Sequence, residues 1–248
     1  MLAPRQLLPR NRPPKGQLPF PILAAVMSNV QKLLRLVAVA LPQPLKRTWF
    51  RRVLGWDVAD DAYVGMSYID ADAVTLGPRS HIGHFNIVRN ISVLALGQDA
   101  FVKDFNHIFG CTPAGMYGER AFRLGDRGHI MSRHFFEVGG AITIGDDTLI
   151  GGRGTQVYTH SLIGPGGVNA WKVGEMIIGD GAKVYASALL IHCRIPPDAI
   201  VAAGAVLTKS YEPEPGQRLL IAGNPALVIG RRPLGGEGGA PALLDTTD

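Results

Sequence analysis

A histidine followed by a glycine-rich stretch is the part of this sequence best suited to proton-transfer chemistry. His160 closes the run Tyr158-Thr159-His160 and precedes the polar, glycine-rich stretch 161–175. A neutral imidazole has an unperturbed pKa of about 6.5, so at neutral pH it can take a proton from a hydroxyl and later return it to a leaving group. A histidine at a loop edge can equally serve only to bond a backbone carbonyl. The elements around His160 must decide between the two.

A six-residue repeat surrounds this histidine. From about Val64 onward an aliphatic residue followed by glycine recurs, at Val64-Gly65, Leu76-Gly77, Ile82-Gly83, Leu96-Gly97, Leu124-Gly125, Ile144-Gly145, Ile150-Gly151 and Ile178-Gly179. In several places the next aliphatic residue follows six positions later. A helix needs apolar spacing near 3.6 and a half-exposed strand needs alternation at two, so neither explains this period.

The repeat predicts a solenoid with three flat faces. Each hexad contributes a short strand with one inward aliphatic side chain, and Gly, Asp or Asn occupies the corner. Coils stacked at the strand spacing of about 4.8 Å make a prism roughly 30 Å long. A β-sandwich with glycine-rich turns is the alternative, but it does not explain the six-residue restart. We therefore expect a mainly β fold over 58–209.

Two stretches interrupt the period and a third part follows it. Residues 111–122 and 161–175 are expected to be loops that leave a coil and return to it, and insertions in repeat proteins gather on the functional face. Loops of this kind can also be inert. The segment 210–232 is expected to cap the open end of the prism, and 233–248 to be a disordered tail.

The N-terminal segment 1–57 is expected to be a basic, amphipathic helical leader. Ile22 to Leu41 is almost continuously apolar, yet Ser28, Gln31, Lys32 and Arg35 fall in one polar stripe of a helix. A spanning helix would bury two cations, so it is disfavoured, and the interrupted apolar run argues against a secretory signal.

A second amphipathic segment, 45–54, places Trp49 and Phe50 among four cations. The two segments could bind an anionic membrane surface through residues 18–54, or they could cover the open end of the prism. The sequence favours neither.

Charge is distributed unevenly. The whole chain has 25 Lys and Arg against 20 Asp and Glu, but the first 56 residues contain ten of the cations and no acid. The remainder is net acidic, which argues against a uniformly basic nucleic-acid-binding protein. Two cysteines are too few for a disulfide scaffold and fit a reducing compartment.

Taken together, these motifs resemble those of the hexapeptide-repeat acyltransferases. The resemblance rests on the hexads, on Thr159-His160 before a loop, and on the ending AAGAVLTK (202–209) followed by AGNPA (222–226). It covers about two thirds of the chain and is strongest to O-acetyltransferases that act on sugars of surface polysaccharides or their lipid-linked precursors. It implies a left-handed parallel β-helix, a homotrimer, acetyl-CoA as co-substrate and no required metal. The implied location is cytoplasmic, with peripheral contact at the inner face of the membrane.

The resemblance also implies roles for individual residues near the acceptor. His160 would be the general base, acting without a covalent intermediate. Glu137, about one coil earlier, matches an acidic position near the acceptor, although Asp is common there and Glu is a departure. His134, on the same coil as Glu137, would line the acceptor pocket, and a surface position is the alternative for it.

For the donor, the family binds coenzyme A in a groove between subunits. The positions that correspond are Ala186 and Ala203, whose small side chains would let the pantetheine arm approach, and Lys209, a point charge for phosphate. The family's further arginine falls on Gly230, so Arg231 is the nearest candidate for that contact.

Two rival functions remain for the same solenoid. One is a metalloenzyme resembling the γ-class carbonic anhydrases, with His81, His84, His107, His129, His134 and His192 as the candidate ligands. Their irregular spacing does not form a zinc-ligand pattern. The other is a non-catalytic scaffold, which would not bind acetyl-CoA.

Overall fold

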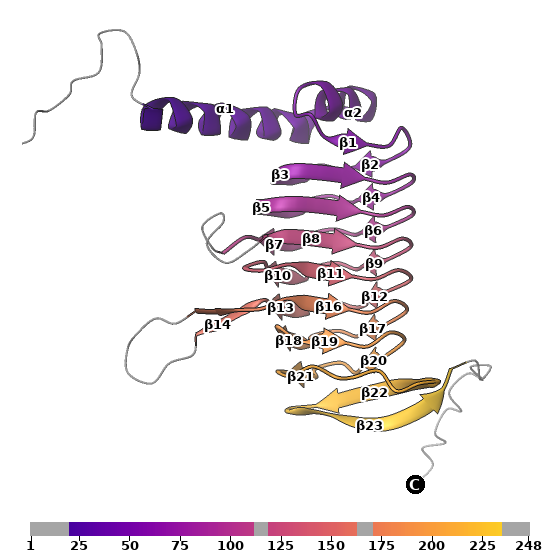
Figure 1. Ribbon diagram of the computed structural model, residues 1–248. Helices are drawn as coiled ribbons and strands as arrows, with labels where there is room; N and C mark the ends of the chain where they lie inside the picture. The colour runs from indigo at the N-terminus through magenta and orange to yellow at the C-terminus, as the bar shows by residue number, and fades with distance from the viewer. Residues whose placement is uncertain (1–19, 112–118, 163–170, 235–248) are drawn as a thin grey trace, which may run out of the picture.

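Parallel strands stacked in coils make up most of the protein. The computed structural model describes residues 20–111, 119–162 and 171–234. Two helices lie at the N-terminal end, and the strands then wind down the length of a prism (Figure 1). The chain is a left-handed parallel β-helix with an N-terminal helical extension. The hexads predict its three-faced coil, and the family resemblance implies its left-handed winding.

Each coil passes through three faces. The first face contains β1 (Asp57–Val58), the C-terminal parts of β3 (Tyr68–Leu76) and β5 (Ile87–Leu96), β8 (Ala121–Leu124), β11 (Ile142–Ile144), β16 (Met176–Ile178) and β19 (Arg194–Ile195). The second contains β2 (Tyr63–Val64), β4 (His81–Ile82), β6 (Phe101–Val102), β9 (His129–Ile130), β12 (Leu149–Ile150), β17 (Lys183–Val184) and β20 (Ile200–Val201). The third contains the N-terminal parts of β3 and β5, then β7 (His107–Phe109), β10 (Phe135–Glu137), β13 (Gln156–Tyr158), β18 (Leu189–Ile191) and β21 (Val206–Leu207).

The aliphatic residues of the hexads form continuous columns in the core. On the third face, parallel pairing sets one inward residue of each strand above the next. The column consists of the buried residues Val88, Ile108, Phe136, Val157, Leu190 and Leu207. Each fully buried side chain of this size stabilises the fold by about 1.5–3 kcal/mol. The prediction of one inward apolar side chain per face is confirmed.

The Gly-Asp pairs of the repeat are explained by the corner between the first and second faces. There the Asp126 carboxylate accepts the Gln98 N–H at 2.7 Å, and Asp146 accepts the Asp126 N–H at 2.7 Å. A Cβ on Gly125 would collide with Asp146 Oδ1, because each carboxylate reaches over the glycine of the coil above. The motif therefore satisfies backbone donors between coils and leaves no room for a side chain at the glycine.

The helix α2 (Gln43–Arg52) covers the open end of the prism. Phe50 is buried, and the ammonium of Lys46, only 2% exposed, donates to the carbonyl oxygens of Val39, Val64 and Gly65. Burial lowers the Lys46 pKa. The lysine thus satisfies carbonyl groups of the first coil and of α1, so α2 has the capping role that was one of the two predictions for the leader.

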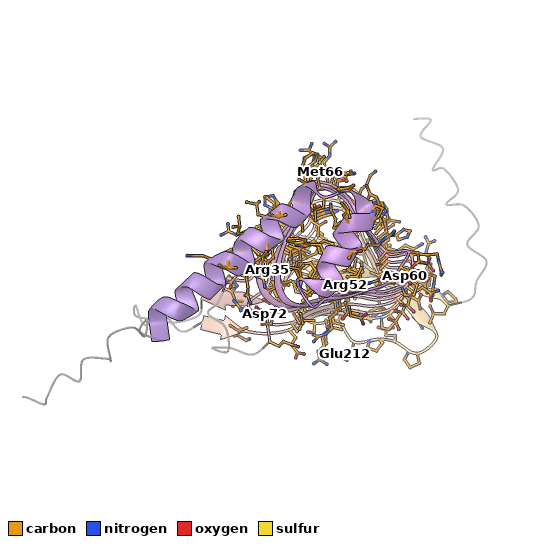
Figure 2. All side chains as sticks on the ribbon, turned by 90° about the horizontal axis from the view of Figure 1, so that it is seen from above. Arg35, Arg52, Asp60, Met66, Asp72 and Glu212 are labelled. Atoms are coloured by element: carbon orange, nitrogen blue, oxygen red, sulfur yellow. The ribbon has the colours of Figure 1, made fainter. Side chains whose placement is uncertain are left out.

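The helix α1 (Phe20–Ala40) packs on the prism through its C-terminal half. Arg35 forms an ion pair with Asp70 and donates to the Ala71 carbonyl at 2.9 Å, while the Trp49 indole of α2 donates to the Leu34 carbonyl at 3.0 Å. Seen from above, α1 crosses the end of the prism and extends beyond its edge (Figure 2). Neither described helix is long and apolar enough for a membrane crossing.

The two predicted loops differ in extent from the structure. Phe122, expected in the first loop, is a fully buried residue of β8. The ends of the second insertion are not loop but a two-stranded antiparallel hairpin of β14 (His160–Leu162) and β15 (Trp171–Val173). Residues 112–118 and 163–170 lie outside the described parts of the chain.

At the C-terminal end, β22 (Gln217–Gly223) continues the second face in parallel with β20, and β23 (Ala226–Pro233) pairs with it antiparallel. The Tyr211 hydroxyl donates to the Ala226 carbonyl at 2.7 Å. The segment expected to cap this end is therefore a hairpin. The expected disordered tail lies almost entirely in 235–248, outside the described residues.

Candidate functional site

Both insertions leave the prism at one edge, where the third face turns into the first. Cys111 follows β7, Glu137 ends β10 and His160 follows β13. Glu137 is paired in register with Phe109 above it and Tyr158 below it. Three consecutive coils therefore place these side chains next to one another, although they are far apart in the sequence.

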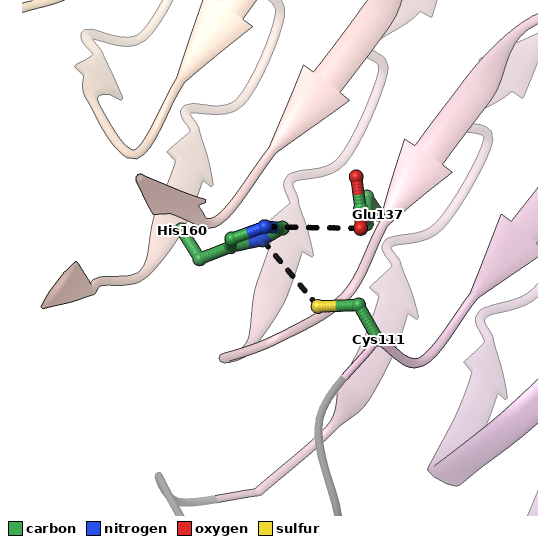
Figure 3. Close-up of side chains that lie close together, drawn as sticks. All are labelled: Cys111, Glu137 and His160. Atoms are coloured by element: carbon green, nitrogen blue, oxygen red, sulfur yellow. Dashed lines mark hydrogen bonds and ion pairs between the residues drawn. The ribbon is translucent and has the colours of Figure 1, made fainter. Parts of the chain in front are cut away.

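The three side chains form a chain of polar contacts (Figure 3). Cys111 Sγ lies 3.4 Å from His160 Nδ1, and a Glu137 carboxylate oxygen lies 3.8 Å from His160 Nε2. The side chains of His160 and Glu137 are 13% and 20% exposed, so the cluster is sheltered but reachable. We refer to Cys111, Glu137 and His160 as the edge cluster.

Electrostatics keep the thiol of the edge cluster protonated. Burial, followed by the negative charge of Glu137, raises the pKa of the Cys111 thiol to about 11, so the thiol keeps its proton at neutral pH. The Glu137 carboxylate lies on the Nε2 side of the His160 ring, and the thiol lies on its Nδ1 side.

Thr159 holds the edge cluster in place. Its buried hydroxyl donates to the Glu137 carbonyl at 3.0 Å and accepts the N–H groups of Gly139 and Gly140 at 2.6 and 3.0 Å. A Cβ on Gly139 would lie only 3.2 Å from Cys111 Sγ. The turn after Glu137 is thus tied to the residue before His160 and packs directly against the thiol.

The Asn90 side chain connects the two ends of the first insertion by hydrogen bonds. The Asn90 side chain donates to the Gly110 carbonyl at 2.7 Å and accepts from the Arg120 guanidinium at 2.6 Å. Gly110 and Arg120 lie on opposite sides of the insertion, so one side chain ties its two ends together. Cys111, next to Gly110, is positioned by this tie.

Sequence reasoning identified His160 and Glu137 as a pair, and the structure brings them together. It missed Cys111. One signal was available: Cys111 and His160 each stand at the start of an insertion, and insertions that leave the same corner of a solenoid bring their first residues to the same edge.

His134 does not belong to the edge cluster. It precedes the opposite end of β10 and is only 2% exposed, where its backbone N–H binds Asn106 Oδ1 at 2.9 Å and its Nδ1 accepts the Thr155 N–H at 3.2 Å. Burial lowers the His134 pKa to about 4. The residue continues a ladder of buried asparagines, and it is neither at the surface nor next to His160.

The four residues expected to bind coenzyme A do not meet within one chain. Ala186 and Ala203 stack at the corner between the second and third faces, with the Gly204 N–H bonded to the Ala186 carbonyl at 2.9 Å. Lys209 follows β21 and lies over the Tyr211 ring at 5.7 Å. Arg231 is paired with Glu214 at 2.7 Å.

Two other histidines of the metalloenzyme alternative lie in a stack of aromatic rings. His81 stacks between Tyr63 and Phe101 on the second face, and His129 meets the edge of Phe101. These rings form an aromatic ladder. Within the described residues, the group that could supply three metal ligands is instead the edge cluster, whose ligand atoms lie within 4.8 Å of one another.

A polar pocket opens at the same edge, one coil above Cys111. Its volume is about 450 Å³. Its walls come from α1, β3 and β5 and from both ends of the first insertion, and they include Arg35, Asp72, Arg89, Asn90 and Phe109. Carboxylate, amide and guanidinium groups beside an aromatic ring suit a ligand rich in hydroxyl groups.

Comparison with known proteins finds similarity among solved structures alone. No protein-family model matches the chain, and no curated protein matches it. A hexapeptide-repeat acetyltransferase from Vibrio cholerae, complexed with acetyl coenzyme A, superposes with a TM-score of 0.47 at 20% identity, covering 87% of this chain and 90% of that one.

Two further structures are more distant. A polySia-specific acetyltransferase has a TM-score of 0.43 at 15% identity, covering 76% of this chain and 85% of that one. A maltose O-acetyltransferase from Clostridium difficile has a TM-score of 0.35 at 14% identity, covering 84% and 87%. At these values the fold assignment rests on the strand topology of the chain itself.

Proposed function

We propose that this protein transfers an acetyl group from acetyl-CoA to a hydroxyl group of a carbohydrate. The observation that supports it most is the edge cluster, in which the imidazole of His160 lies between the Glu137 carboxylate and the Cys111 thiol, at the edge of the prism where a polar pocket also opens. The resemblance in the sequence motifs names the donor, and the pocket suits a hydroxyl-rich acceptor.

The chemistry requires few groups from the protein. A thioester is already activated, whereas a sugar hydroxyl is fully protonated at neutral pH and is a weak nucleophile. His160 takes the hydroxyl proton during attack and returns it to the departing sulfur. Glu137 stabilises the imidazolium that forms between these steps, because its carboxylate lies beside the other ring nitrogen.

The arrangement of the small residues supports a homotrimer. Ala186 and Ala203 lie at one end of the third-face strands and His160 lies at the other end. In a closed ring of three copies, the Ala186 edge of one chain meets the His160 edge of the next. The coenzyme A groove would then run between subunits, and each site would need two chains.

The acceptor would enter from the polar pocket. Its cations, Lys32, Arg35, Arg89 and Arg120, outnumber its acids, Asp70 and Asp72. Asp72 has no ion pair among the described residues and can accept hydrogen bonds from sugar hydroxyls. The excess of positive charge favours a saccharide that carries a carboxylate or phosphate, such as a lipid-linked precursor.

Peripheral membrane contact would occur through the leader. On α1 the side chains of Val30, Leu33, Leu36 and Val37 are 49, 59, 57 and 41% exposed, and Leu33 and Leu36 border a surface pocket together with Tyr68 and Ile87 of the prism. The described part of the leader, 20–56, contains cations and no acid. An exposed apolar helix face with neighbouring cations suits the surface of an anionic bilayer, here the inner face of the cytoplasmic membrane.

The proposal is tested first by donor binding. Calorimetry of the full-length protein with acetyl-CoA should show one site per chain, and thiol release should then identify an acceptor among nucleotide sugars and lipid-linked saccharides. A scaffold would show no acetyl-CoA binding. Stoichiometric zinc in protein purified without chelator would favour the metalloenzyme instead, because the edge cluster offers three possible ligands.

A further inference from the structure

The corner between the second and third faces changes character halfway along the prism. In six consecutive coils one residue at this corner has a positive φ, and these residues are Phe85, Phe105, Arg133, Gly154, Ser187 and Gly204. The backbone N–H of each bonds to a carbonyl of the coil above. The first three residues have large side chains, and the last three have small side chains or none. The change falls between Arg133 and Gly154.

The backbone does not explain the two phenylalanines at this corner. A left-handed conformation favours Gly, Asn or Asp and is unfavourable for a bulky side chain. Phe85 and Phe105 nevertheless adopt it, at φ 57° and 61°. Their side chains are 50 and 45% exposed, so the core does not require them, and their rings stack at 5.2 Å between centroids. Strained, exposed aromatic residues are typical of a binding surface.

Cations without counterions lie next to these rings. The Arg133 guanidinium lies 5.0 Å from the centroid of the Phe105 ring. Arg133 also lines a hollow of about 370 Å³ together with Lys103 and Arg153, and its described walls contain no acid. Across residues 20–111, 119–162 and 171–234, no ion pair involves any of these three cations. We refer to Phe85, Phe105, Lys103, Arg133 and Arg153 as the basic corner.

The basic corner lies at the height of the edge cluster. Phe105 precedes β7 and Cys111 follows it, and Arg133 precedes β10 while Glu137 ends it. Within one chain the third face separates the two sites. In the homotrimer proposed above, rotation about an axis parallel to the prism leaves every residue at its height. The basic corner of one chain then faces the edge cluster of the next.

We propose that the basic corner binds a negatively charged group of the acceptor, a carboxylate or a phosphate, beside the edge cluster of the neighbouring chain. The inference rests on the proposed function and its trimer, and it narrows the acceptor to an anionic saccharide. Guanidinium groups, here those of Arg133 and Arg153, bind such anions through paired N–H donors. The exposed rings of Phe85 and Phe105 offer an apolar surface on which a sugar ring can lie.

The two halves of the corner then have different substrates. The small residues at and below Gly154 leave the lower half open to the donor, and this half includes the predicted coenzyme A positions Ala186 and Ala203. The large residues above Gly154 contact the acceptor. Gly154 precedes β13 and His160 follows it, so donor and acceptor meet at the height of the base.

Binding of small probes tests the charge preference without knowledge of the acceptor. Glucose, glucuronate and glucose 1-phosphate are compared by saturation-transfer NMR with full-length protein and saturating coenzyme A, which keeps the donor groove filled. We expect at least one anionic probe to bind at least roughly tenfold more tightly than glucose. The two anionic probes distinguish a carboxylate site from a phosphate site. Equal binding of all three probes would overturn the inference.

A double variant assigns this preference to the basic corner. Arg133→Gln with Arg153→Gln should abolish it. The matched control is Arg79→Gln with Arg127→Gln, because these arginines also have positive φ and lie at the corner between the first and second faces. The control should bind the probes as wild type does. A preference that survives the loss of Arg133 and Arg153 would place the anion in the polar pocket and contradict the proposal.

Mixed trimers test whether two chains share the site. His160→Ala chains are co-expressed with chains that lack Arg133 and Arg153, and the acceptor identified by thiol release is used below its KM. About one interface in four then joins an intact edge cluster to an intact basic corner, so we expect about a quarter of the wild-type rate from two nearly inactive parents. No gain over the parents, or a wild type that transfers acetyl as a monomer, would overturn the shared site and leave acetyl transfer intact. A wild type that does not bind acetyl-CoA would overturn both.

Discussion

The hydroxyl of Thr159 donates to the backbone carbonyl of Glu137. The two residues lie on consecutive coils, next to the edge cluster. The same oxygen accepts two backbone N–H groups of the turn that follows Glu137. One buried side chain therefore sets the spacing between the carboxylate and the imidazole.

Replacement of this hydroxyl should impair both stability and activity. Thr159→Val keeps the shape but removes three hydrogen bonds, including those that the Gly139 and Gly140 N–H groups donate to the hydroxyl. We expect the free energy of unfolding to fall by about 3 kcal/mol and kcat to fall at least about tenfold. Thr148→Val is the matched control, since Thr148 is equally buried at another corner and should lower stability alone. Equal kcat losses in the two variants would contradict the positioning role.

Buried His134 should make stability depend on pH. Its folded pKa of about 4 lies below the unfolded value of about 6.5, so the unfolded chain binds more protons between these values. Stability from this residue is present above pH 6.5 and is lost as the pH falls toward 4, by up to about 3 kcal/mol.

The variant His134→Asn keeps a hydrogen-bond acceptor but does not titrate. Urea unfolding of wild type and variant at pH 7 and pH 4.5 measures the difference between their pH dependences. We expect the variant to lose less stability on acidification. Identical pH dependences would show that His134 is not protonated on unfolding.

The polar pocket should determine acceptor affinity. Asp72→Ala removes a carboxylate from the wall of the pocket, so the acceptor KM should rise about tenfold, while acetyl-CoA binding by calorimetry should not change. Asp57→Ala, an exposed acid on the first face, serves as the control. A rise in the acetyl-CoA Kd in place of the acceptor KM would place the donor, not the acceptor, in this pocket.

The exposed face of α1 should carry membrane binding. The double variant Leu33→Ser with Leu36→Ser should bind vesicles containing phosphatidylglycerol at least about tenfold more weakly than wild type in a sedimentation assay. Leu227→Ser with Ile229→Ser, exposed at the other end of the prism, should bind normally. If the α1 variant binds as wild type does, the helices have only the capping role.

The coil could be predicted from the sequence because its physical requirements repeat. Successive corners between the first and second faces share one fit between a glycine and the carboxylate of the next coil, at Gly97 with Asp126, Gly125 with Asp146 and Gly145 with Asp180, so the motif recurs along the chain. His160 and Glu137 could be paired for the same reason, since a regular repeat places them on consecutive coils.

The rest depended on contacts that the repeat does not specify. Cys111 lies beside His160 only because the insertion that follows Cys111 leaves the prism at the same edge as the insertion that begins at His160. The residues of the first insertion interrupt the six-residue period, so the repeat does not reveal that the two residues are neighbours. His134 is buried because it takes the place of an asparagine in the ladder that includes Asn106. Arg35 occupies the predicted polar stripe, but its partner Asp70 could not be known from helix periodicity.

Substitution of His160 tests the central claim most directly. Acetyl transfer to an identified carbohydrate acceptor is measured by thiol release for wild type and His160→Ala, together with acetyl-CoA binding by calorimetry. His129→Ala, an exposed histidine on the second face, is the control. We predict that His160→Ala loses transfer by at least about 100-fold while its acetyl-CoA Kd stays unchanged. Transfer at the wild-type rate in His160→Ala would contradict the assignment.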